Sequence, residues 1–460
     1  MFSYMKREPG FYRQVAVLAA PIVLQNLITS TLGMADTFMV GMLGEVPMAA
    51  VTLANIPLFV VQMLIFGMQS GSSVLMSQYW GKQDLKAINR VMGVAMWAAG
   101  LVTAVFVVVM VFWPVEFLSL FGNEPEVIRL AAEYGQIAVI SYAFAAITMI
   151  YVTAYRSMEK PQLGLYILVS SMLINTFLNW VFIFGNLGAP AMGVRGAALA
   201  TAIARFIELM IVVLHMAFNR FFRVELGLLL RPGREMAVRF ARYGSPVVAN
   251  ETMWGVGSSV FPTIMGHMDG STEILAAYTI AGNMDKIGMV VSFGLAATAA
   301  VIIGREVGAG RSKEVQAVGM ALNTLALLCG VVVGILLLVF ACVIAPALVY
   351  PLFQLSARAG TIATVMMIIQ GLVRPLRDYN SVTIVGVLRG GGDVRAATLI
   401  DVCPLWLVAI PLAALCGLVL KTDIIWVYIA MSLEHIVKCG AGFCRMRTGR
   451  WIRDLTAAGR

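Results

Sequence analysis

The sequence lacks the short motifs that would drive or catalyse chemistry. It contains no G-x-x-x-x-G-K-[ST] segment, which excludes an ATP-driven engine encoded in this chain. It also contains neither H-E-x-x-H nor G-x-S-x-G, the local signatures of zinc proteases and serine hydrolases. Its three histidines, His215, His267 and His435, are scattered. We therefore expect a protein that is not an enzyme and that needs no cofactor and no structural metal.

Charged residues and paired cysteines are also scarce. Only 12% of the residues are charged, whereas a soluble domain carries about 25%. The six cysteines show no C-x-x-C spacing and fall in or beside apolar runs, so we interpret them as small buried hydrophobes rather than a disulfide framework. With 60% hydrophobic residues and a mean hydropathy of +0.87, the chain is predicted to be an integral membrane protein.

Long apolar runs dominate what is present. A membrane-spanning helix needs about 20 mostly apolar residues, and the chain contains about twelve such runs. The predicted spans are 14–40, 48–79, 91–113, 131–155, 162–184, 194–218, 243–266, 275–303, 315–346, 360–388, 396–419 and 423–444. The fold is therefore predicted to be all-α, with no room for a soluble domain.

The loops between these runs alternate in charge. About 25 Lys and Arg fall in every second connection and at both chain ends. The intervening loops hold only Arg129, Arg195, Arg358 and Lys421. By the positive-inside rule both termini should be cytoplasmic, in a multi-pass protein of the cell inner (plasma) membrane. The N-terminus shows no cleavage site for a signal peptide. The net charge of +9 is thus explained by topology and anionic lipid headgroups, and nucleic acid is not an expected partner.

The chain contains an internal repeat. Residues 20–41 align with 245–266, where Pro21 matches Pro246, and AAVTLANI at 49–56 then meets AAYTIAGN at 276–283. An even number of spans per half places both halves in the same orientation, which is typical of parallel-repeat secondary transporters. The predicted segments are a six-helix N-terminal lobe (1–218), a basic cytoplasmic linker (219–242), a six-helix C-terminal lobe (243–445) and a cytoplasmic tail (446–460).

The first span carries a carboxylate, Asp36. At helical spacing Gln25, Thr29, Gly33 and Asp36 share one face, which gives a polar stripe on an otherwise apolar helix. A carboxylate inside a membrane costs at least ~2.5 kcal/mol, and intramembrane acids commonly mark ion or substrate pathways. The alternative is a structural Asp that a neighbouring helix neutralises.

Further polar side chains lie within other spans, and several have a structural alternative. Asn175 and Asn179 share a face and could serve only helix–helix packing. Arg205 and Glu208, near Thr201, are spaced to neutralise each other. Asp285-Lys286 is likewise interpreted as mainly structural. The remaining polar positions are Asn250 and Glu251 in the seventh span and Gln370, Arg374, Asp378 and Ser381 in the tenth, where Pro375 is expected to kink the helix.

The order of motifs along the whole chain resembles the multidrug and toxic compound extrusion (MATE) family, in particular its bacterial NorM/DinF-like members. The matching segments are PIVLQN with G-x-x-D-x-x-x-V-G in the first span, Tyr155-Arg156-Ser157-Met158 with Pro161, Asn175 to Gly185, Gly193 to Thr201, Gly304 to Gly310, and Val387 to Asp393.

This resemblance implies two pseudo-symmetric six-helix lobes in a V shape that export organic, often cationic, amphipathic compounds in exchange for H⁺ or Na⁺. It implies an ion- or proton-binding site in the N-lobe. From their places in the spans we expect Gln25 and Asn250 to be supporting residues. That N-lobe site comprises Asp36, Asn175, Asn179 and Thr201. Glu251 and Asp378 match acidic positions of the NorM-like branch, with transient Na⁺ binding expected at Asp36 or Glu251. One departure stands out, because Arg374 replaces a Tyr of that branch.

Arg374 lies four residues before Asp378, at a spacing that lets the two side chains touch. We therefore expect Asp378 to be a structural or gating partner of Arg374 and Asp36 to be the main coupling carboxylate. The alternative function is a flippase of lipid-linked sugars or other polyprenyl-type lipids, which would need a cationic cavity built from Arg205, Lys286, Arg374 and Arg377. A channel or scaffold is the third alternative. The expected partners are a small organic substrate and membrane lipid, and we expect a monomer.

Overall fold

A computed structural model describes residues 8–122, 124–352 and 355–457. Within these ranges the chain is helical and contains no strand; its single β-bridge joins Gly392 and Ile452. The predicted all-α class is therefore confirmed. The sequence dictates this class because backbone N–H and C=O groups in lipid must be satisfied within their own segment, which a helix achieves.

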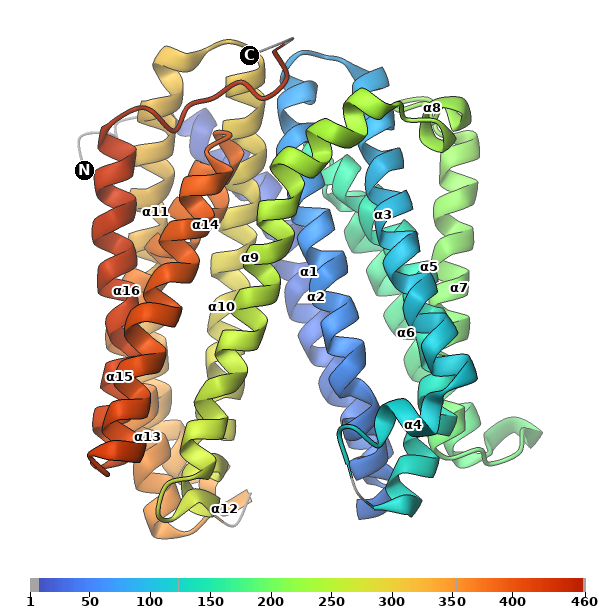
Figure 1. Cartoon of the computed structure of the whole chain (residues 1–460), viewed down its shortest axis with the longest axis vertical. Coiled ribbons are helices and arrows are strands. Elements are labelled where there is room, and N and C mark those ends of the chain that lie inside the picture. Colours follow the sequence, from blue (N-terminus) through green and yellow to red (C-terminus); the bar gives the residue numbers. More distant parts are fainter. Residues whose placement is uncertain (1–7, 123, 353–354, 458–460) are drawn as a thin grey trace. The chain divides into compact units, whose positions relative to one another are not determined.

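Twelve long helical segments occupy the twelve predicted spans (Figure 1). In the first half these are α1 (Pro9–Gly41), α2 (Glu45–Gly81), α3 (Leu85–Phe112), α5 (Pro125–Ser157), α6 (Gln162–Phe184) and α7 (Val194–Phe218). In the second half they are α9 (Arg234–Gly266), α10 (Ser271–Gly308), α11 with η3 (Ser312–Val349), α13 with η4 (Ala357–Leu388), α14 to η6 (Val394–Val419) and α16 (Ile424–Arg447). Short helices α4 (Pro114–Leu118), α8 (Leu226–Leu230) and α12 (Tyr350–Leu352) lie in the connections, with η2 (Asn186–Gly188).

Eleven of the long helices in the described part of the chain are apolar enough to cross a membrane by length and composition. The remaining one, α9, has 33 residues and is long enough, but Arg234, Arg239, Arg242 and Glu251 lower its hydropathy. Its polar first turns extend the helix nine residues before the predicted span. The chain is therefore a multi-pass membrane protein.

The helices form two compact units whose boundaries fall inside α1 and α9. Unit 2 comprises Leu24–Thr252, and unit 1 comprises the described residues up to Val23 together with those from Met253 onward. The two break points are near-equivalent positions of the sequence repeat. The units thus differ from the predicted segments 1–218 and 243–445 by the N-terminal halves of these two helices. The reason is packing: Val15 and Leu18 of α1 join the core of unit 1. In α9, a Cβ on Gly71 of α2 would lie 2.9 Å from Gly244 Cα.

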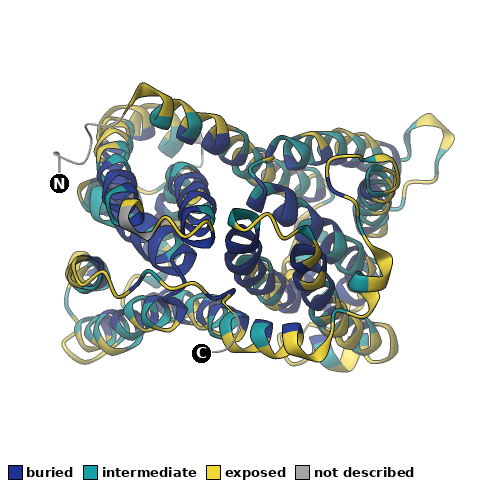
Figure 2. Cartoon of the chain, turned by 90° about the horizontal axis from the view of Figure 1, so that it is seen from above, coloured by how far each residue is buried: buried dark blue, intermediate teal, exposed yellow. Residues whose placement is uncertain are grey.

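In unit 2 the fourth long helix, α5, is central and packs against α2, α3 and α7. Small residues such as Ala131 and Ala138 let these helices approach, and Leu58, Met110 and Ile128 fill the core between them. Buried residues gather on the faces that the helices turn toward one another, and exposed residues lie on the outer faces (Figure 2). This apolar exterior is what a lipid-facing surface requires.

In unit 1 the fourth long helix of the second half, α13, holds the equivalent central place against α10, α11 and α16. Gly330 and Gly334 of α11 allow the close approach: a Cβ on Gly330 would lie 2.7 Å from Pro375 Cα, and one on Gly334 would lie 2.5 Å from Gly371 O. Pro375 has no backbone N–H and so cannot donate the helical hydrogen bond to the carbonyl oxygen of Gly371. The helix nevertheless runs through Pro375 to Ser381 and then widens into the π-helical turn η4 (Val382–Leu388).

The predicted linker and the described residues of the tail both pack on the helices. The linker is held on unit 2, where Phe222 is fully buried and Asn89 Nδ2 donates to Arg223 O at 3.1 Å. Residues 448–457 of the tail fold back onto unit 1, where Trp451 is fully buried. The six cysteines are free thiols, as expected, but none is buried: Cys342 and Cys444 are exposed and the other four are half-buried, so their interpretation as buried hydrophobes was wrong.

Candidate functional site

Asp36 lies on the part of α1 that belongs to unit 2, within reach of α6. Its Oδ1 accepts a hydrogen bond of 2.6 Å from Asn179 Nδ2. The helix can carry a carboxylate there because its amide partner satisfies part of the carboxylate's hydrogen-bonding capacity. Asp36 is partly buried and forms no ion pair with any side chain in the described ranges.

The polar groups of α6 and α7 continue the contact. Asn175 and Asn179, four residues apart on α6, are 3% and 1% exposed. Asn179 Nδ2 also approaches Asn175 Oδ1 at 3.2 Å, and Asn175 Nδ2 donates to Thr201 Oγ1 of α7 at 3.3 Å. The structure thus joins all four residues that the resemblance assigned to the N-lobe in one chain of hydrogen bonds: Asp36, Asn179, Asn175 and Thr201, here called the N-lobe cluster.

One acceptor in this cluster is unused. The buried Oδ1 of Asn179 has no hydrogen-bond partner among the described residues. A carboxylate beside amide and hydroxyl oxygens is the donor set of a hard cation, and a carboxylate alone suffices for a proton. The residues present therefore fit a transient H⁺ or Na⁺. No group of three His, Cys, Asp or Glu that could hold a metal occurs in the described ranges.

Arg205 of α7 interacts electrostatically with Asp36. Its Nη1 lies 2.7 Å from Glu208 Oε2, and this carboxylate also accepts a hydrogen bond of 3.0 Å from Ser171. The contact fits the prediction that Arg205 and Glu208 neutralise each other. Asp36 is consequently the acid of this region whose charge no cation directly balances.

Gln25 and the two polar residues of α9, Asn250 and Glu251, all belong to unit 2. Gln25 Nε2 donates to Pro161 O at 2.8 Å and so fastens the turn between α5 and α6. Asn250 and Glu251 belong to unit 2, whereas Arg374 and Asp378 belong to unit 1. The expected grouping of Glu251 with Asp378 and Arg374 therefore spans two units. The helix register places Glu251 just before the boundary at Thr252, where α9 passes from one core to the other.

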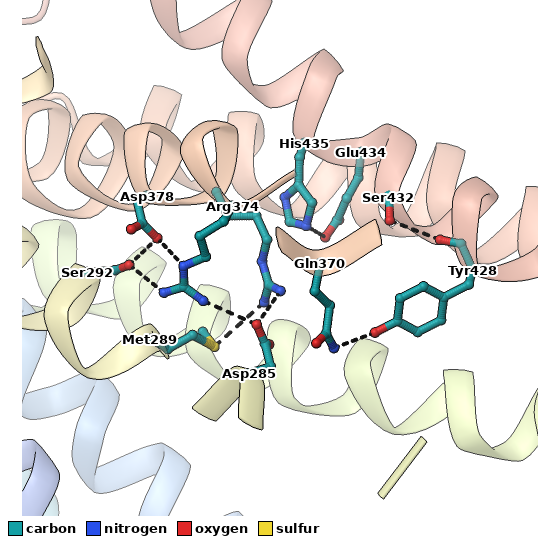
Figure 3. A network of polar contacts seen from close by, with 11 residues as sticks. Asp285, Met289, Ser292, Gln370, Arg374, Asp378, Tyr428, Ser432, Glu434 and His435 are labelled. Carbon is teal, nitrogen blue, oxygen red and sulfur yellow. Dashed lines mark hydrogen bonds and ion pairs between the residues drawn. The ribbon is translucent and has the colours of Figure 1, made fainter. Parts of the chain in front are cut away.

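In unit 1 the tenth span carries a dense ionic network (Figure 3). Arg374 is fully buried, and its Nε lies 2.8 Å from Asp378 Oδ1. Its Nη1 lies 3.1 Å from Asp285 Oδ1, and its Nη2 donates to Ser292 Oγ at 2.9 Å. Arg377 Nη1 lies 2.7 Å from the same Asp285 oxygen. Ser292 also donates to Asp378. We call these five residues the arginine network.

The predicted contact between Arg374 and Asp378 is present. Asp285, interpreted from the sequence as mainly structural, pairs with Arg374 and Arg377 of α13, whereas its neighbour Lys286 is exposed. Two arginines face two aspartates, so the network is formally neutral. Because a guanidinium remains charged at any physiological pH, these carboxylates are already matched by built-in cations.

A second buried cluster was missed from the sequence. Lys438 of α16 is 3% exposed and lies 3.0 Å from Asp401 Oδ1 and 3.2 Å from Glu434 Oε2. Lys438, which the sequence analysis counted among the about 25 charges of the connections and chain ends, thus lies within α16 and in ion pairs. Arg389, counted in the same set, is 1% exposed and lies 3.6 Å from Asp401 Oδ2. The available signal was the spacing of Glu434 and Lys438, four residues apart within a span.

Comparison with known proteins gives a consistent picture. The MatE family model matches residues 21–181 and 247–415. The Probable multidrug resistance protein NorM of Thermotoga maritima is 24% identical over 452 residues, which cover 98% of this chain and 95% of that protein. The protein of the same name in Rhizobium meliloti is 30% identical over 332 residues, covering 69% and 68%.

Solved structures show the same fold. A MOP superfamily transporter from Pyrococcus furiosus superimposes with a TM-score of 0.84 at 18% identity, covering 97% of this chain and 96% of that one. A eukaryotic MATE transporter gives 0.83 at 18% identity, covering 96% and 97%. The family model accounts for most of the chain and matches both halves of the repeat. The chain therefore belongs to the MatE family of membrane transporters.

Proposed function

We propose that this protein is a secondary active multidrug exporter that moves organic, cationic amphipathic compounds out of the cell in exchange for H⁺ or Na⁺. The observation that carries the proposal is the state of Asp36, an intramembrane carboxylate bound by an amide and by no cation of the described chain. The names of the bacterial relatives, which are called multidrug resistance proteins, support the substrate class.

The coupling step follows from the charge of the N-lobe cluster. When Asp36 faces the outside, a proton or Na⁺ neutralises it without displacing a built-in cation, because its partner in the cluster is the neutral amide of Asn179. A cationic substrate prefers the conformation in which Asp36 is ionised. Exchange results when the two ligands favour opposite conformations, since each can shift the equilibrium only by its differential affinity.

The arginine network has a different role in this scheme. Asp378 is held by Arg374 and Ser292, so an incoming metal ion would meet a guanidinium at the carboxylate it needs. We propose that Asp378 fixes α13 against α10. Coupling by one site in the N-lobe agrees with the neutral balance of charges in unit 1.

The flippase alternative is not favoured. A flippase of lipid diphosphates would need unpaired cations lining a cavity. Three of the four candidate cations, however, are paired with carboxylates: Arg205 with Glu208, and Arg374 and Arg377 with Asp285. The exposed Lys286 alone would not match a diphosphate.

We further propose that the protein works as a monomer, needs no cofactor beyond the coupling ion, and has both termini in the cytoplasm. Cysteine labelling of whole cells tests the orientation. A cysteine at Asp269, in the loop after α9, should react with an impermeant maleimide, whereas cysteines at Gly233 and Arg450 should react only after permeabilisation. External labelling at position 233 would contradict the proposed topology. A cysteine near Asn123 is also expected to be labelled from outside, and this position lies outside the described residues.

The test of the function is efflux from proteoliposomes. Purified protein is reconstituted with ethidium inside, and a proton gradient or a Na⁺ gradient is imposed separately at constant membrane potential. We expect one of the two gradients to accelerate ethidium release above that of protein-free vesicles. Release that neither gradient accelerates would contradict ion-coupled export, and a gated ion leak without ethidium movement would support a channel.

A further inference from the structure

The last described residues of the chain, 448–457, fold back over the end of unit 1 (Figure 1). After α16 the tail turns back, and the fully buried Trp451 donates from Nε1 to Gln316 Oε1 at 2.9 Å and to Met446 O at 3.1 Å. A Cβ on Gly391 would lie 2.3 Å from the Trp451 ring, so only glycine fits there. The indole thus fills the space between α11, α16 and the turn that follows η4.

Backbone hydrogen bonds and ion pairs also hold the tail in this position. Arg453 N donates to Gly391 O at 2.7 Å, next to the bridge between Gly392 and Ile452. Asp393, which is 2% exposed, lies 2.6 Å from Arg445 Nε and 3.4 Å from Arg453 Nη1. We call this arrangement the tail clasp. It explains the Gly-Gly-Asp sequence at 391–393, to which the proposed transport mechanism assigns no role.

A hollow of about 760 Å³ lies beside the tail clasp. Its apolar lining is Met320 of α11, Phe443 of α16 and Ile452 of the tail. Its charged group is Arg447, which is exposed, lies 5.7 Å from the Phe443 ring and has no carboxylate partner in the described ranges. Gln316 also lines the hollow, but its two amide atoms already bond Met446 O and Trp451.

We propose that this hollow binds an anionic phospholipid, with the phosphate on Arg447 and the first part of an acyl chain on Met320, Phe443 and Ile452. A guanidinium offers two parallel donors to a phosphate, and the volume suits a headgroup with the chain that follows it. A small soluble anion would leave the three apolar side chains without a partner.

The location supports a lipid as occupant. The hollow lies where α16 ends, in the segment that is richest in arginine and that the proposed orientation places at the cytoplasmic membrane surface, where anionic lipids concentrate. Asp393 engages Arg445 and Arg453, which leaves Arg447 as the arginine that lines the hollow. A bound lipid would touch α11, α16 and the tail together and so stabilise the tail clasp.

The experiment uses the full-length protein in a neutral detergent and titrates dioleoylphosphatidylglycerol. Native mass spectrometry measures binding, and thermal unfolding measures stabilisation. For the wild type we expect a saturable first binding event and a raised Tm. Arg447→Gln should weaken that binding about tenfold, as the loss of a charge-assisted hydrogen bond implies. The matched control is Arg450→Gln, which removes the same charge from an exposed tail residue outside the hollow and should change affinity less than about twofold.

Three results would overturn the proposal. Equal losses in Arg447→Gln and Arg450→Gln would indicate diffuse surface charge, and wild-type binding by Arg447→Gln would exclude the site. A Tm shift produced equally by inorganic phosphate would indicate a soluble anion instead of a lipid. Dioleoylphosphatidylcholine should give little shift. Because the measurement needs no ion gradient, its outcome is separate from that of the efflux test.

Discussion

The two units solve the same electrostatic problem in different ways. In unit 2 the intramembrane carboxylate Asp36 is bound by the amide of Asn179, and the nearby Arg205 is matched by Glu208. In unit 1 the carboxylates of Asp285 and Asp378 are bound directly by guanidinium groups of α13. The surrounding architecture is similar, because the fourth long helix of each half is the central one. The difference therefore lies in the side chains and not in the fold.

In the proposed mechanism this difference decides which carboxylate exchanges its counter-ion. An amide is neutral, so the proposal has a mobile ion balance the negative charge of Asp36. A guanidinium on the same helix as Asp378 is a tethered cation that cannot dissociate. Evolution of one repeat toward exchange and of the other toward fixed pairing would give a transporter with a single coupling site.

The local backbone conformation also differs between the two units. Within the described residues the π-helical turns η3 (Phe340–Val349), η4, η5 (Leu405–Ala409) and η6 (Leu415–Val419) all belong to unit 1. Prolines at 346, 404 and 411 lie in or beside three of them. Such wide turns release carbonyl groups and often accompany functional sites. Of these, η4 lies between Asp378 and Arg389, and η5 begins four residues after Asp401, so two of the turns are close in sequence to ion-paired residues.

The largest effect is expected from Asp36, the carboxylate proposed to exchange its counter-ion. Asp36→Asn keeps the size and the hydrogen-bonding partner but removes the charge that binds the coupling ion. We expect gradient-driven ethidium efflux to fall to the uncoupled background while the protein remains folded. The control is Asp269→Asn, an equivalent change at an exposed loop position. Coupled efflux near the wild-type rate in Asp36→Asn would show that this carboxylate is structural.

The second test concerns the fixed pair. Asp378→Asn leaves Arg374 buried with only Asp285 as a carboxylate partner, and breaking a buried pair costs about 3–5 kcal/mol. We expect a lower yield and a lower Tm, with unchanged apparent affinity for the driving ion. Combining it with Arg374→Ala should restore part of the stability, since Asp285 keeps Arg377. A shift in ion affinity at normal protein level, without rescue in the double variant, would instead assign coupling to unit 1.

Part of this structure could be predicted from the sequence. Hydropathy and charge alternation located all twelve helices, because each must satisfy its backbone within the bilayer. Spacing along one helix predicted the pairs of Arg374 with Asp378 and of Arg205 with Glu208. The sequence pattern of one helix does not show which residues of another helix it contacts. The ion-pair partners of Asp285, Lys438 and Arg389 on other helices were therefore not predicted. The exchange of the N-terminal halves of α1 and α9 between the units likewise depends on packing that no local pattern records.

The third test compares the packing of the two central helices. Gly334→Ala would bring a methyl group to 2.5 Å from the backbone oxygen of Gly371, which cannot move without shifting α13. Gly135→Ala in α5 would meet Met110 Cε, the flexible end of a side chain. We expect overpacking to cost about 1–3 kcal/mol at Gly334 and less at Gly135, measured as Tm in detergent. Equal Tm values for the two variants would contradict the tighter contact of α13 with α11.

The smallest effects should appear as a graded series within the N-lobe cluster. Asn179 donates directly to Asp36, Asn175 contacts Asn179, and Thr201 contacts only Asn175 among these residues. A hydrogen bond to a charged group contributes about 1.5–3 kcal/mol and one between neutral groups about 0.5–1.5 kcal/mol. The rate of gradient-driven efflux should therefore fall most in Asn179→Ala, less in Asn175→Ala and least in Thr201→Val.

This order separates coupling from helix packing. If the amides only held α6 against its neighbours, the fully buried positions Asn175 and Asn179 would give similar losses of Tm and similar losses of efflux. If they serve Asp36, efflux should follow the position in the hydrogen-bond chain while Tm changes little between the two variants. Asp36→Asn combined with Asn179→Ala should then be no worse than Asp36→Asn alone, because the amide acts through the carboxylate. An additive loss in that double variant would assign Asn179 a role independent of Asp36.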